Sequence, residues 1–467
     1  MILWNSLWNN LCLLRPAFTR ERTFLWFALA VTGLLTRNDL AGVTSIVRAL
    51  GLLPLFYYSL LGMFHSKAVC LPKLTRLWQQ LVSQSLSPFI YKVNGRPVCI
   101  ADGIKVAKAG RKMPAVKILH QESESNTKPE YIYGHSCQAI AMLAGTLESL
   151  FAIPLGCRIH EGVVFSNRDK STLLDKLITL IRTMGFKESV YLVADAYYGS
   201  RKIIHALLKD GHHLVVALRS NAVAYAIPPA PERKRRGAPK KYGKKIRLKT
   251  LFDEPEVMMT AKSPVYGEEN VVIRYRVIDL LWRRAGKLVR FVAVDHPLRG
   301  KKIFLSTDTA LASIDIIRIY GLRFKIEVAF KQAIHTIGTY AYHFWMKMMK
   351  PLPRKSGNQY LHRTTKTYRA AIVRKMCAYH TFMMAGVIAQ GIAQILSITQ
   401  TKTVWAAFGS WIRTIRPNVL PSEMVVLTAL KNTLHEFLAD KAKNNILAKF
   451  IRGKIDISRS EGMKLVA

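Results

Sequence analysis

Two short apolar runs, each closed by an aspartate, constrain the fold of this chain more than any other feature. They are Pro97-Val-Cys-Ile-Ala-Asp102 and Val190-Tyr-Leu-Val-Ala-Asp195. Apolar runs this continuous predict strands that are covered on both faces. An aspartate that closes such a strand lies at the carboxyl edge of the sheet, where α/β proteins place their sites. Taken singly, either aspartate could equally be a helix cap or a loop residue.

The segments around these runs predict a mixed α/β sheet with helices packed on its faces. The helical patterns are amphipathic, and the strand patterns are short and bounded by turn residues. The further strands are expected at 131–135, 152–159 and 213–218, and the helices at 171–184 and 201–208.

A third acid lies in the segment 320–331, which contains good helix formers and no proline. Tyr320, Arg323, Glu327 and Lys331 follow one another by three, four and four residues, so a helix places them on one face. A carboxylate between two cations suits a metal site for a phosphodiester, because the cations can hold phosphate oxygens. The alternative is an ordinary surface ion pair of Glu327 with Lys331, worth about 0.3–0.5 kcal/mol.

Charge indicates the partner. The 467 residues include 70 Lys and Arg against 29 Asp and Glu, a net charge of +41. Such an excess predicts a polyanionic partner, with double-stranded DNA favoured and an anionic membrane surface as the competing interpretation. The apolar runs 24–35 and 382–395 are too short to span a bilayer. The six scattered cysteines fit reduced thiols, so we expect a cytoplasmic protein without a membrane partner.

Composition shifts divide the chain into five predicted regions. The terminal regions are helical, and a stretch of cations and turn residues precedes a set of β-patterned segments. The regions are 1–90 (helical), 91–220 (first part of the α/β core), 221–310 (basic loop and β insertion), 311–345 (core helix with Glu327) and 346–467 (helical); the resemblance described below implies a DNA-end-binding role for the first, a catalytic role for the core and a possible dimerisation role for the last.

The insertion carries the predicted DNA contacts outside the Glu327 helix. The basic loop should track phosphates or enter a minor groove through Arg235, Arg236, Lys240 and Lys241, although a solvated linker would have the same composition. Trp282 lies at the predicted turn between two strands with alternating cations.

Asp102, Asp195 and Glu327 together could hold two divalent ions about 4 Å apart. One ion would lower the pKa of the attacking water or 3′-hydroxyl, and the other would stabilise the leaving oxygen. Oxygen-only ligands favour Mg²⁺, with Mn²⁺ as a substitute, over zinc.

These residues resemble the DDE transposases of bacterial insertion sequences, in the insertion-sequence-four-type branch with a β insertion. Asp195 follows Asp102 by 93 residues, and Glu327 follows Asp195 by 132, which leaves room for that insertion. Tyr320, Arg323 and Glu327 fit the branch signature Tyr-x2-Arg-x3-Glu-x6-Lys, and the phrase Asp195-Ala-Tyr-Tyr-Gly-Ser is similar to the second-Asp motif. The last signature position holds Ile334, and Lys331 is the nearest cation on that face.

The resemblance implies an RNase H-like core and cut-and-paste transposition by a homodimer on paired terminal inverted repeats, followed by joining to target DNA. It implies a hairpin intermediate and a bacterial, nucleoid-associated enzyme. It also implies that Tyr320 and Arg323 bind the strand beside the cleavage point, and that an aromatic residue of the insertion stacks on a flipped base. Trp282 is the candidate for that residue, and a packing role is the alternative.

Two other functions stay open at this stage. An RNase H-like nuclease without strand joining uses the same metal chemistry, and a catalytically inactive relative could bind DNA as a regulator. The presence of all three acids and Arg323 argues against the regulator, and a peripheral membrane protein would leave the acids unexplained.

Overall fold

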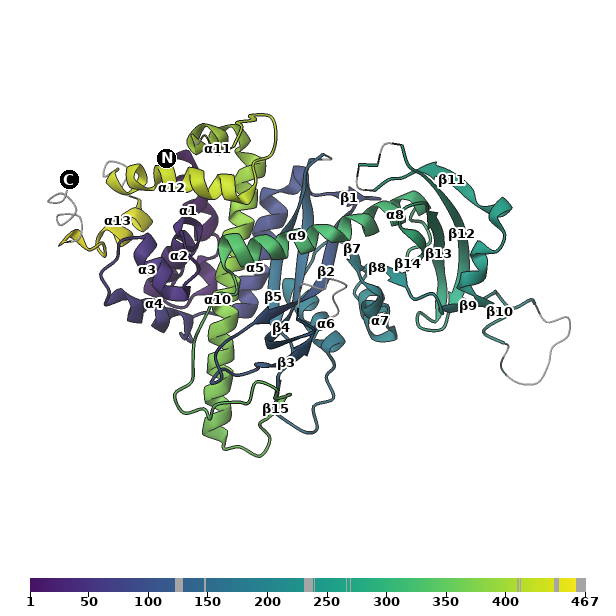
Figure 1. The fold of residues 1–467 in the computed structure, drawn as a ribbon, viewed down its shortest axis with the longest axis horizontal. Helices are drawn as coiled ribbons and strands as arrows, with labels where there is room; N and C mark the ends of the chain where they lie inside the picture. Colours follow the sequence, from purple (N-terminus) through teal and green to yellow (C-terminus); the bar gives the residue numbers. More distant parts are fainter. Residues whose placement is uncertain are drawn as a thin grey trace.

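The expected mixed α/β fold is present in the computed structural model, which describes residues 1–121, 129–146, 148–230, 238, 240–265, 267–268, 270–409, 411, 413–440 and 445–458. A large mixed sheet runs through the centre of the molecule, with helices on both faces and a helical body at one end (Figure 1).

The core of the sheet combines parallel and antiparallel strands. β2 pairs in parallel with β7, and β7 with β8, while β4 pairs antiparallel with β2 and β5. The bounds of these strands are β2 Arg96–Ala107, β4 Tyr131–Gly145, β5 Leu150–Ile159, β7 Tyr191–Ala194 and β8 His213–Leu218. All four residues of β7 are buried, as its continuous apolar run predicts. Two short strands extend this part, β1 (Lys92–Val93) beside β2 and β3 (Lys117–His120) beside β4.

The predicted β insertion is antiparallel, but it continues the core sheet and does not form a sheet of its own. β14 pairs with β8, from Ile303 opposite Leu218 to Ser306 opposite Val215, so the hydrogen-bonded ladder passes from the core into the insertion. The insertion strands are β9 Val223–Tyr225, β10 Lys245–Arg247, β11 Met259–Lys262, β12 Val272–Trp282, β13 Lys287–His296 and β14 Gly300–Ser306.

Two sets of helices cover the core sheet. α8 and α9 pack on one face, and α5, α6 and α7 pack on the other. Their bounds are α5 Leu71–Ser85, α6 Leu173–Met184, α7 Arg201–Lys209, α8 Ser313–Gly321 and α9 Lys325–Gln332. The single helix expected at 320–331 is therefore α8 and α9 joined by a 3-10 turn, Leu322–Phe324. Gly321 lies so close to Val265 that a β-carbon there would come within 2.4 Å of its side chain.

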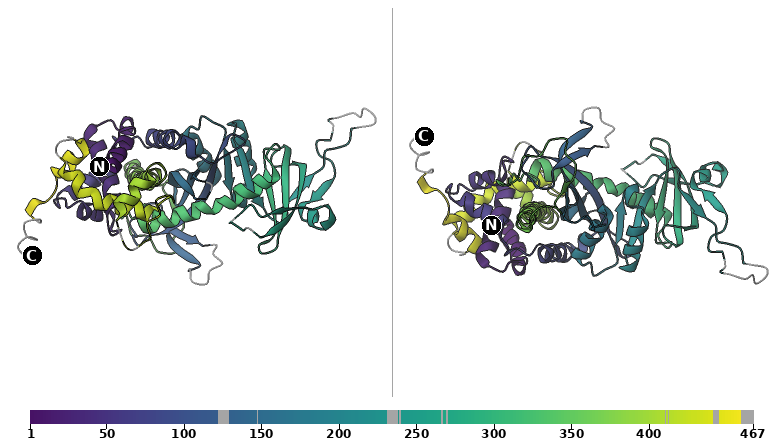
Figure 2. Two further views of the ribbon diagram at one scale, coloured as in Figure 1. Left: turned by 90° about the horizontal axis from the view of Figure 1, so that it is seen from above. Right: turned by 90° about the horizontal axis from the view of Figure 1, so that it is seen from below.

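The N-terminal and C-terminal helical regions, which composition predicts as two separate regions, pack together as one helical body. Figure 2 shows the first and last helices gathered at the same end of the molecule. Trp4 of α1 stacks on Phe437 of α12 at 4.9 Å, and α10 contacts α2, α4 and α12. The helices of this body are α1 Ile2–Cys12, α2 Glu21–Thr36, α3 Gly42–Ala49, α4 Phe56–Phe64, α10 Lys366–Thr399, α11 Thr401–Phe408, α12 Glu423–Ala439 and α13 Ile446–Arg452.

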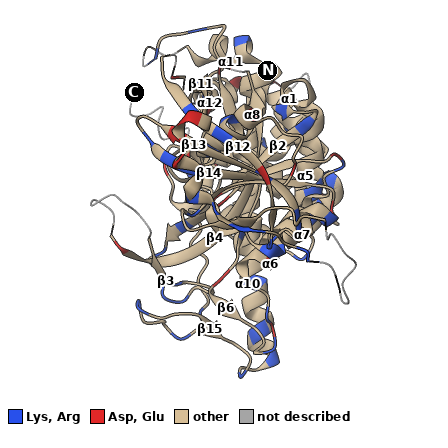
Figure 3. Cartoon of the chain, turned by 90° about the vertical axis from the view of Figure 1, so that its right-hand side faces the viewer, with Lys and Arg blue, Asp and Glu red and all other residues tan. Residues whose placement is uncertain are grey.

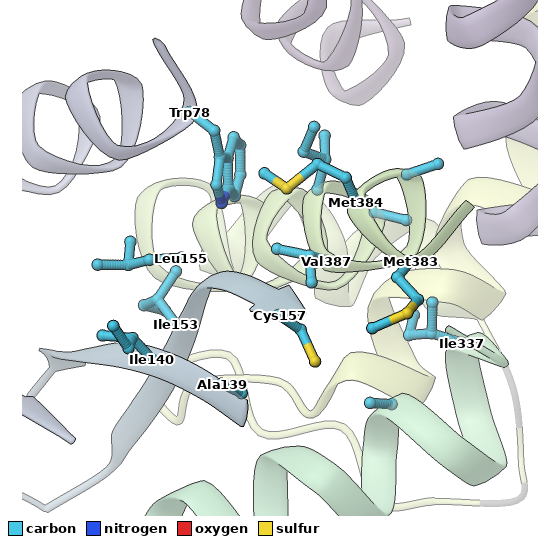
Figure 4. Close-up of a cluster of buried hydrophobic side chains, with 14 of the residues drawn as sticks. Trp78, Ala139, Ile140, Ile153, Leu155, Cys157, Ile337, Met383, Met384 and Val387 are labelled. Atoms are coloured by element: carbon cyan, nitrogen blue, oxygen red, sulfur yellow. The ribbon is translucent and has the colours of Figure 1, made fainter. Parts of the chain in front are cut away.

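Helix α10 is the central packing element between this body and the sheet. By length and composition alone it could cross a membrane, since it has 34 residues, but its most apolar window is entirely buried inside the protein. Met383, Met384 and Val387 pack there among side chains from β4, β5 and α5 (Figure 4). The polar Gln390 donates to the carbonyl of Ala329 at 3.0 Å, so this amide is bonded in the core. α10 has the burial pattern of a core helix.

Candidate active site

Asp102 and Asp195 come together because β2 and β7 are parallel neighbours. Val98 pairs with Tyr191, and Ile100 with Val193, so the same register carried two residues further sets Asp102 beside Asp195. The expectation that Asp102 closes its strand is wrong, because β2 continues to Ala107 through pairing with β4. The parallel pairing is what ends there, since β7 stops at Ala194. Asp195 then caps a 3-10 turn, accepting a hydrogen bond from the Tyr197 backbone N–H at 3.0 Å.

Glu327 reaches the same edge of the sheet from α9, through Arg323. The Arg323 guanidinium donates from Nη1 to Asp102 Oδ2 at 2.7 Å and from Nη2 to Glu327 Oε1 at 2.9 Å. The ion pair of Glu327 is therefore with Arg323, one turn before it, whereas Lys331 on the following turn is exposed. The structure thus brings Asp102, Asp195, Glu327 and Arg323 together at one place.

The pKa of Asp102 rises to about 6 in this cluster. Burial is the main cause, because it disfavours the charged carboxylate. Arg323 and the Gly103 backbone N–H lower the pKa, and the negative charges of Asp195 and Glu327 raise it. Asp195 and Glu327 therefore both lie within electrostatic reach of Asp102, and the cluster carries more negative charge than Arg323 neutralises.

The oxygen atoms that the cluster offers are of the type that binds a divalent cation. Its three acids offer only oxygen ligands, which suit Mg²⁺ or Mn²⁺. Within the part of the chain that the structure describes, no three His, Cys, Asp or Glu side chains are close enough to hold one ion as they stand. Arg323 occupies an oxygen of Asp102 and of Glu327, so a guanidinium stands where a cation would neutralise these two carboxylates.

The residues predicted to contact DNA differ in their accessibility. Tyr320 is half-buried and packs on Phe304 with ring centroids 4.6 Å apart. Lys240 and Lys241 are exposed, whereas Arg235 and Arg236 lie outside the described residues.

Trp282 does not have the exposure that base stacking requires. It is 4% exposed and packs edge-on against Phe291, as the packing alternative predicts. Its neighbour Arg284 donates to the carbonyl of Gly199 at 2.8 Å, which ties the β12–β13 turn to the loop after Asp195.

Two further sets of contacts were not predicted from the sequence. Tyr198 is buried under the two aspartates, and burial is the main reason that the pKa of its hydroxyl lies above its usual range. Arg283 stacks near the rings of Tyr225 and Tyr242, at 4.5 and 5.6 Å from their centroids. No local pattern in the sequence pairs Arg283 with Tyr225 and Tyr242, which lie 58 and 41 residues before it.

The comparison with protein families agrees with the chemistry of this cluster. Residues 14–283 match the family described as DDE superfamily endonuclease. The chain belongs to this superfamily. The resemblance to DDE enzymes drawn from the three acids is thereby confirmed at the level of the superfamily, whose members generally use divalent metal ions. The matched span contains Asp102 and Asp195 and ends before Glu327.

Two further comparisons give less information about this DDE superfamily endonuclease than the family match does. No curated protein matches its sequence. A solved structure of piggyBac transposase in a synaptic complex with hairpin DNA is similar over 94% of this chain and 77% of that chain, with 11% identity and a TM-score of 0.35. That similarity is too low to carry an argument about function.

Proposed function

We propose that this DDE superfamily endonuclease is the transposase of a bacterial insertion sequence. It would cut the element out at its terminal inverted repeats and join the ends to target DNA, acting as a homodimer on paired ends in the cytoplasm at the nucleoid. The observation that carries this proposal is the convergence of three carboxylates and an arginine at one edge of the sheet, in a chain of net charge +41.

Asp102, Asp195 and Glu327 would hold Mg²⁺, or Mn²⁺ in its place, as two ions per site. When bound, such ions activate the attacking oxygen and stabilise the leaving oxygen of a phosphodiester. Arg323 already presents its guanidinium between two of the acids, so it is placed to pair with a phosphate that enters beside them. The exposed Lys331 would add a second phosphate contact from the following turn of α9.

The rest of the protein supplies attraction for the substrate. Lys and Arg are spread over many elements of the molecule, with few acids among them (Figure 3). This excess favours DNA binding that weakens steeply as salt is raised. A hairpin intermediate, which the insertion-sequence-four-type branch implies, would place the second-strand cleavage in the same site.

A cleavage assay on DNA that carries the element's terminal inverted repeats tests the proposal. Cutting and strand joining are expected with Mg²⁺ or Mn²⁺ and not with EDTA. Each of the variants Asp102→Asn, Asp195→Asn and Glu327→Gln should lower the rate of DNA cleavage at least a hundredfold. DNA binding, measured at a fixed salt concentration, should stay intact. Glu188→Gln is the matched control, since Glu188 is an exposed carboxylate paired with Lys92 away from this cluster.

Each outcome has a defined meaning. Normal cutting by any of the three variants would refute the assigned triad. Metal-dependent cutting without joined products would instead identify a nuclease, and binding without any cutting would identify an inactive DNA-binding regulator.

A further inference from the structure

A large cavity lies on the other face of the core sheet from Asp102. It has a volume of about 820 Å³, within the size range of small-molecule sites. It opens to solvent and is lined by the end of α4 and the start of α5, by β4 and β5, by α6 and by the first half of α10. Asp102 pairs with Ala139, and Ala139 with Cys157, so the neighbouring Gln138 and Arg158 point to the opposite face, where they line the cavity.

Arg158 gives the cavity an uncompensated positive charge. Its guanidinium donates from Nη1 to the carbonyl of Cys157 at 2.8 Å and from Nη2 to Thr75 Oγ1 at 2.6 Å, and both acceptors are neutral. Burial lowers the pKa of Arg158 below its usual range, which reflects the cost of holding this charge away from water. Lys67, Lys176 and Arg374 also line the cavity.

No acidic side chain in the lining of the cavity balances these positive charges. Among the described residues that line it, none is Asp or Glu. The carboxylate of Glu161 comes within 3.9 Å of the ring of the lining residue His160, but its ion pair is with Lys117 at 2.8 Å, outside the cavity lining. An anion is therefore the charge that the cavity lacks.

Among the other polar groups of the cavity, His160, His380 and Gln138 are neutral, and two of them are partly unsatisfied. Burial lowers the pKa of His160 to about 4 and that of His380 to about 3, so both rings are uncharged at neutral pH. Gln138 is 2% exposed, and its Oε1 has no hydrogen-bond partner among the described residues. His160 is 8% exposed and its Nδ1 is likewise without a partner there. Apolar groups of Leu71, Leu180 and Val373 make up much of the remaining wall.

We propose that this cavity binds a free nucleotide, with its phosphate against Arg158, Lys176 and Arg374 and its base among the neutral imidazoles and the apolar wall. The charge, the size and the mixture of neutral donors and acceptors each fit a nucleoside phosphate. This inference does not rest on the transposase proposal, because the cavity and the carboxylate cluster lie on opposite faces of the sheet.

Isothermal titration calorimetry on the full-length, DNA-free protein tests this site. Deoxyadenosine monophosphate is the probe, deoxyadenosine and inorganic phosphate are the comparison ligands, and EDTA is present so that no metal bridges the probe to the carboxylates. The nucleotide is expected to bind at least tenfold more tightly than either comparison ligand. Equal affinity for deoxyadenosine or for phosphate alone, or binding only by a 5′-phosphorylated DNA end, would overturn the proposal.

Variants locate the binding to the cavity. Arg158→Gln should weaken nucleotide binding at least tenfold, and the more exposed Arg374→Gln severalfold. Val373→Trp, at a position 47% exposed on α10, should block the cavity without removing a cation. Lys73→Gln is the control, since Lys73 is an exposed cation of α5 outside the cavity. If Arg158→Gln does not fold, the other two variants decide, and unchanged affinity in both would refute the site.

Discussion

Replacing Asp102 by asparagine should stabilise the metal-free protein at neutral pH, although it removes an acid of the proposed active site. The pKa of Asp102 rises from its ordinary value of 3.8 to about 6, mainly through burial. Because the folded state holds its proton more tightly than the unfolded state, this residue costs no stability below about pH 4. The cost grows as pH rises from 4 to 6 and is complete above that range.

The size of this effect follows from the pKa. At about 1.4 kcal/mol per pH unit, a rise from 3.8 to about 6 corresponds to about 3 kcal/mol. The Asp102 side chain is only 18% exposed, so solvent screens little of it. The pKa already includes the favourable ion pair with Arg323 and the repulsion by Asp195 and Glu327. Asparagine resembles the protonated acid and should recover most of this free energy.

Thermal unfolding in EDTA at pH 4, 6 and 8 measures the effect. With an unfolding entropy of about 2 cal/mol/K per residue, a chain of this length unfolding as one unit gains about 1 °C per kcal/mol. Asp102→Asn should therefore melt about 3 °C above the wild type at pH 8, with the difference shrinking toward pH 4. Such a gain at a functional residue is the expected form of a stability–activity trade-off.

Asp175→Asn is a control for which the expected change in stability has the opposite sign. Hydrogen bonds to Lys202 and Thr172 lower the pKa of Asp175 to about 2, so its stabilisation is present above pH 4 and is lost as pH falls toward 2. This variant should be less stable than the wild type at pH 8. An Asp102→Asn variant that also melts below the wild type at pH 8 would refute the proposed electrostatics of the site.

Three further variants test other contacts. Arg323→Gln should bind Mn²⁺ severalfold more tightly than the wild type, because the substitution frees oxygens of Asp102 and Glu327. Calorimetry without DNA measures this affinity. Arg323→Lys, which keeps the positive charge, is the control and should have an affinity closer to that of the wild type. Gly134→Ala would set a β-carbon 2.0 Å from the carbonyl oxygen of Val106 and should cost at least about 1–3 kcal/mol in chemical denaturation, while Gly62→Ala, with open space around it, should cost nothing. Burial lowers the pKa of Lys108 to about 7, so wild-type stability should rise between pH 7 and 10.5, and Lys108→Met should lose that rise.

Local sequence was sufficient for several of the elements and for the chemical types of the site residues. The apolar run before Asp195 becomes a fully buried strand, and the spacing in 320–331 sets Arg323 and Glu327 one turn apart. These features depend on side-chain periodicity and backbone preference over a few residues, which the sequence displays directly. The three acids also allowed the superfamily to be recognised.

Trp282 shows where local reasoning ends. Its position at a hairpin turn was predicted, but the packing of Phe291 on the next strand decides that the ring is buried. In the same way, composition divides the terminal helices into two regions, and only the contact between Trp4 and Phe437 shows that they share one core.

By itself, the sequence determined that this protein has a buried strand ending at Asp195, a helical segment with Arg323 and Glu327 on one face, and a large positive charge. The tertiary structure alone decided that Arg323 meets Asp102 across 221 residues, that the insertion continues the core sheet, and that a cavity opens behind it. The physical reason is range. Strand order and register follow from the packing of distant segments against one another, and no periodicity within a single segment records which partner it will meet.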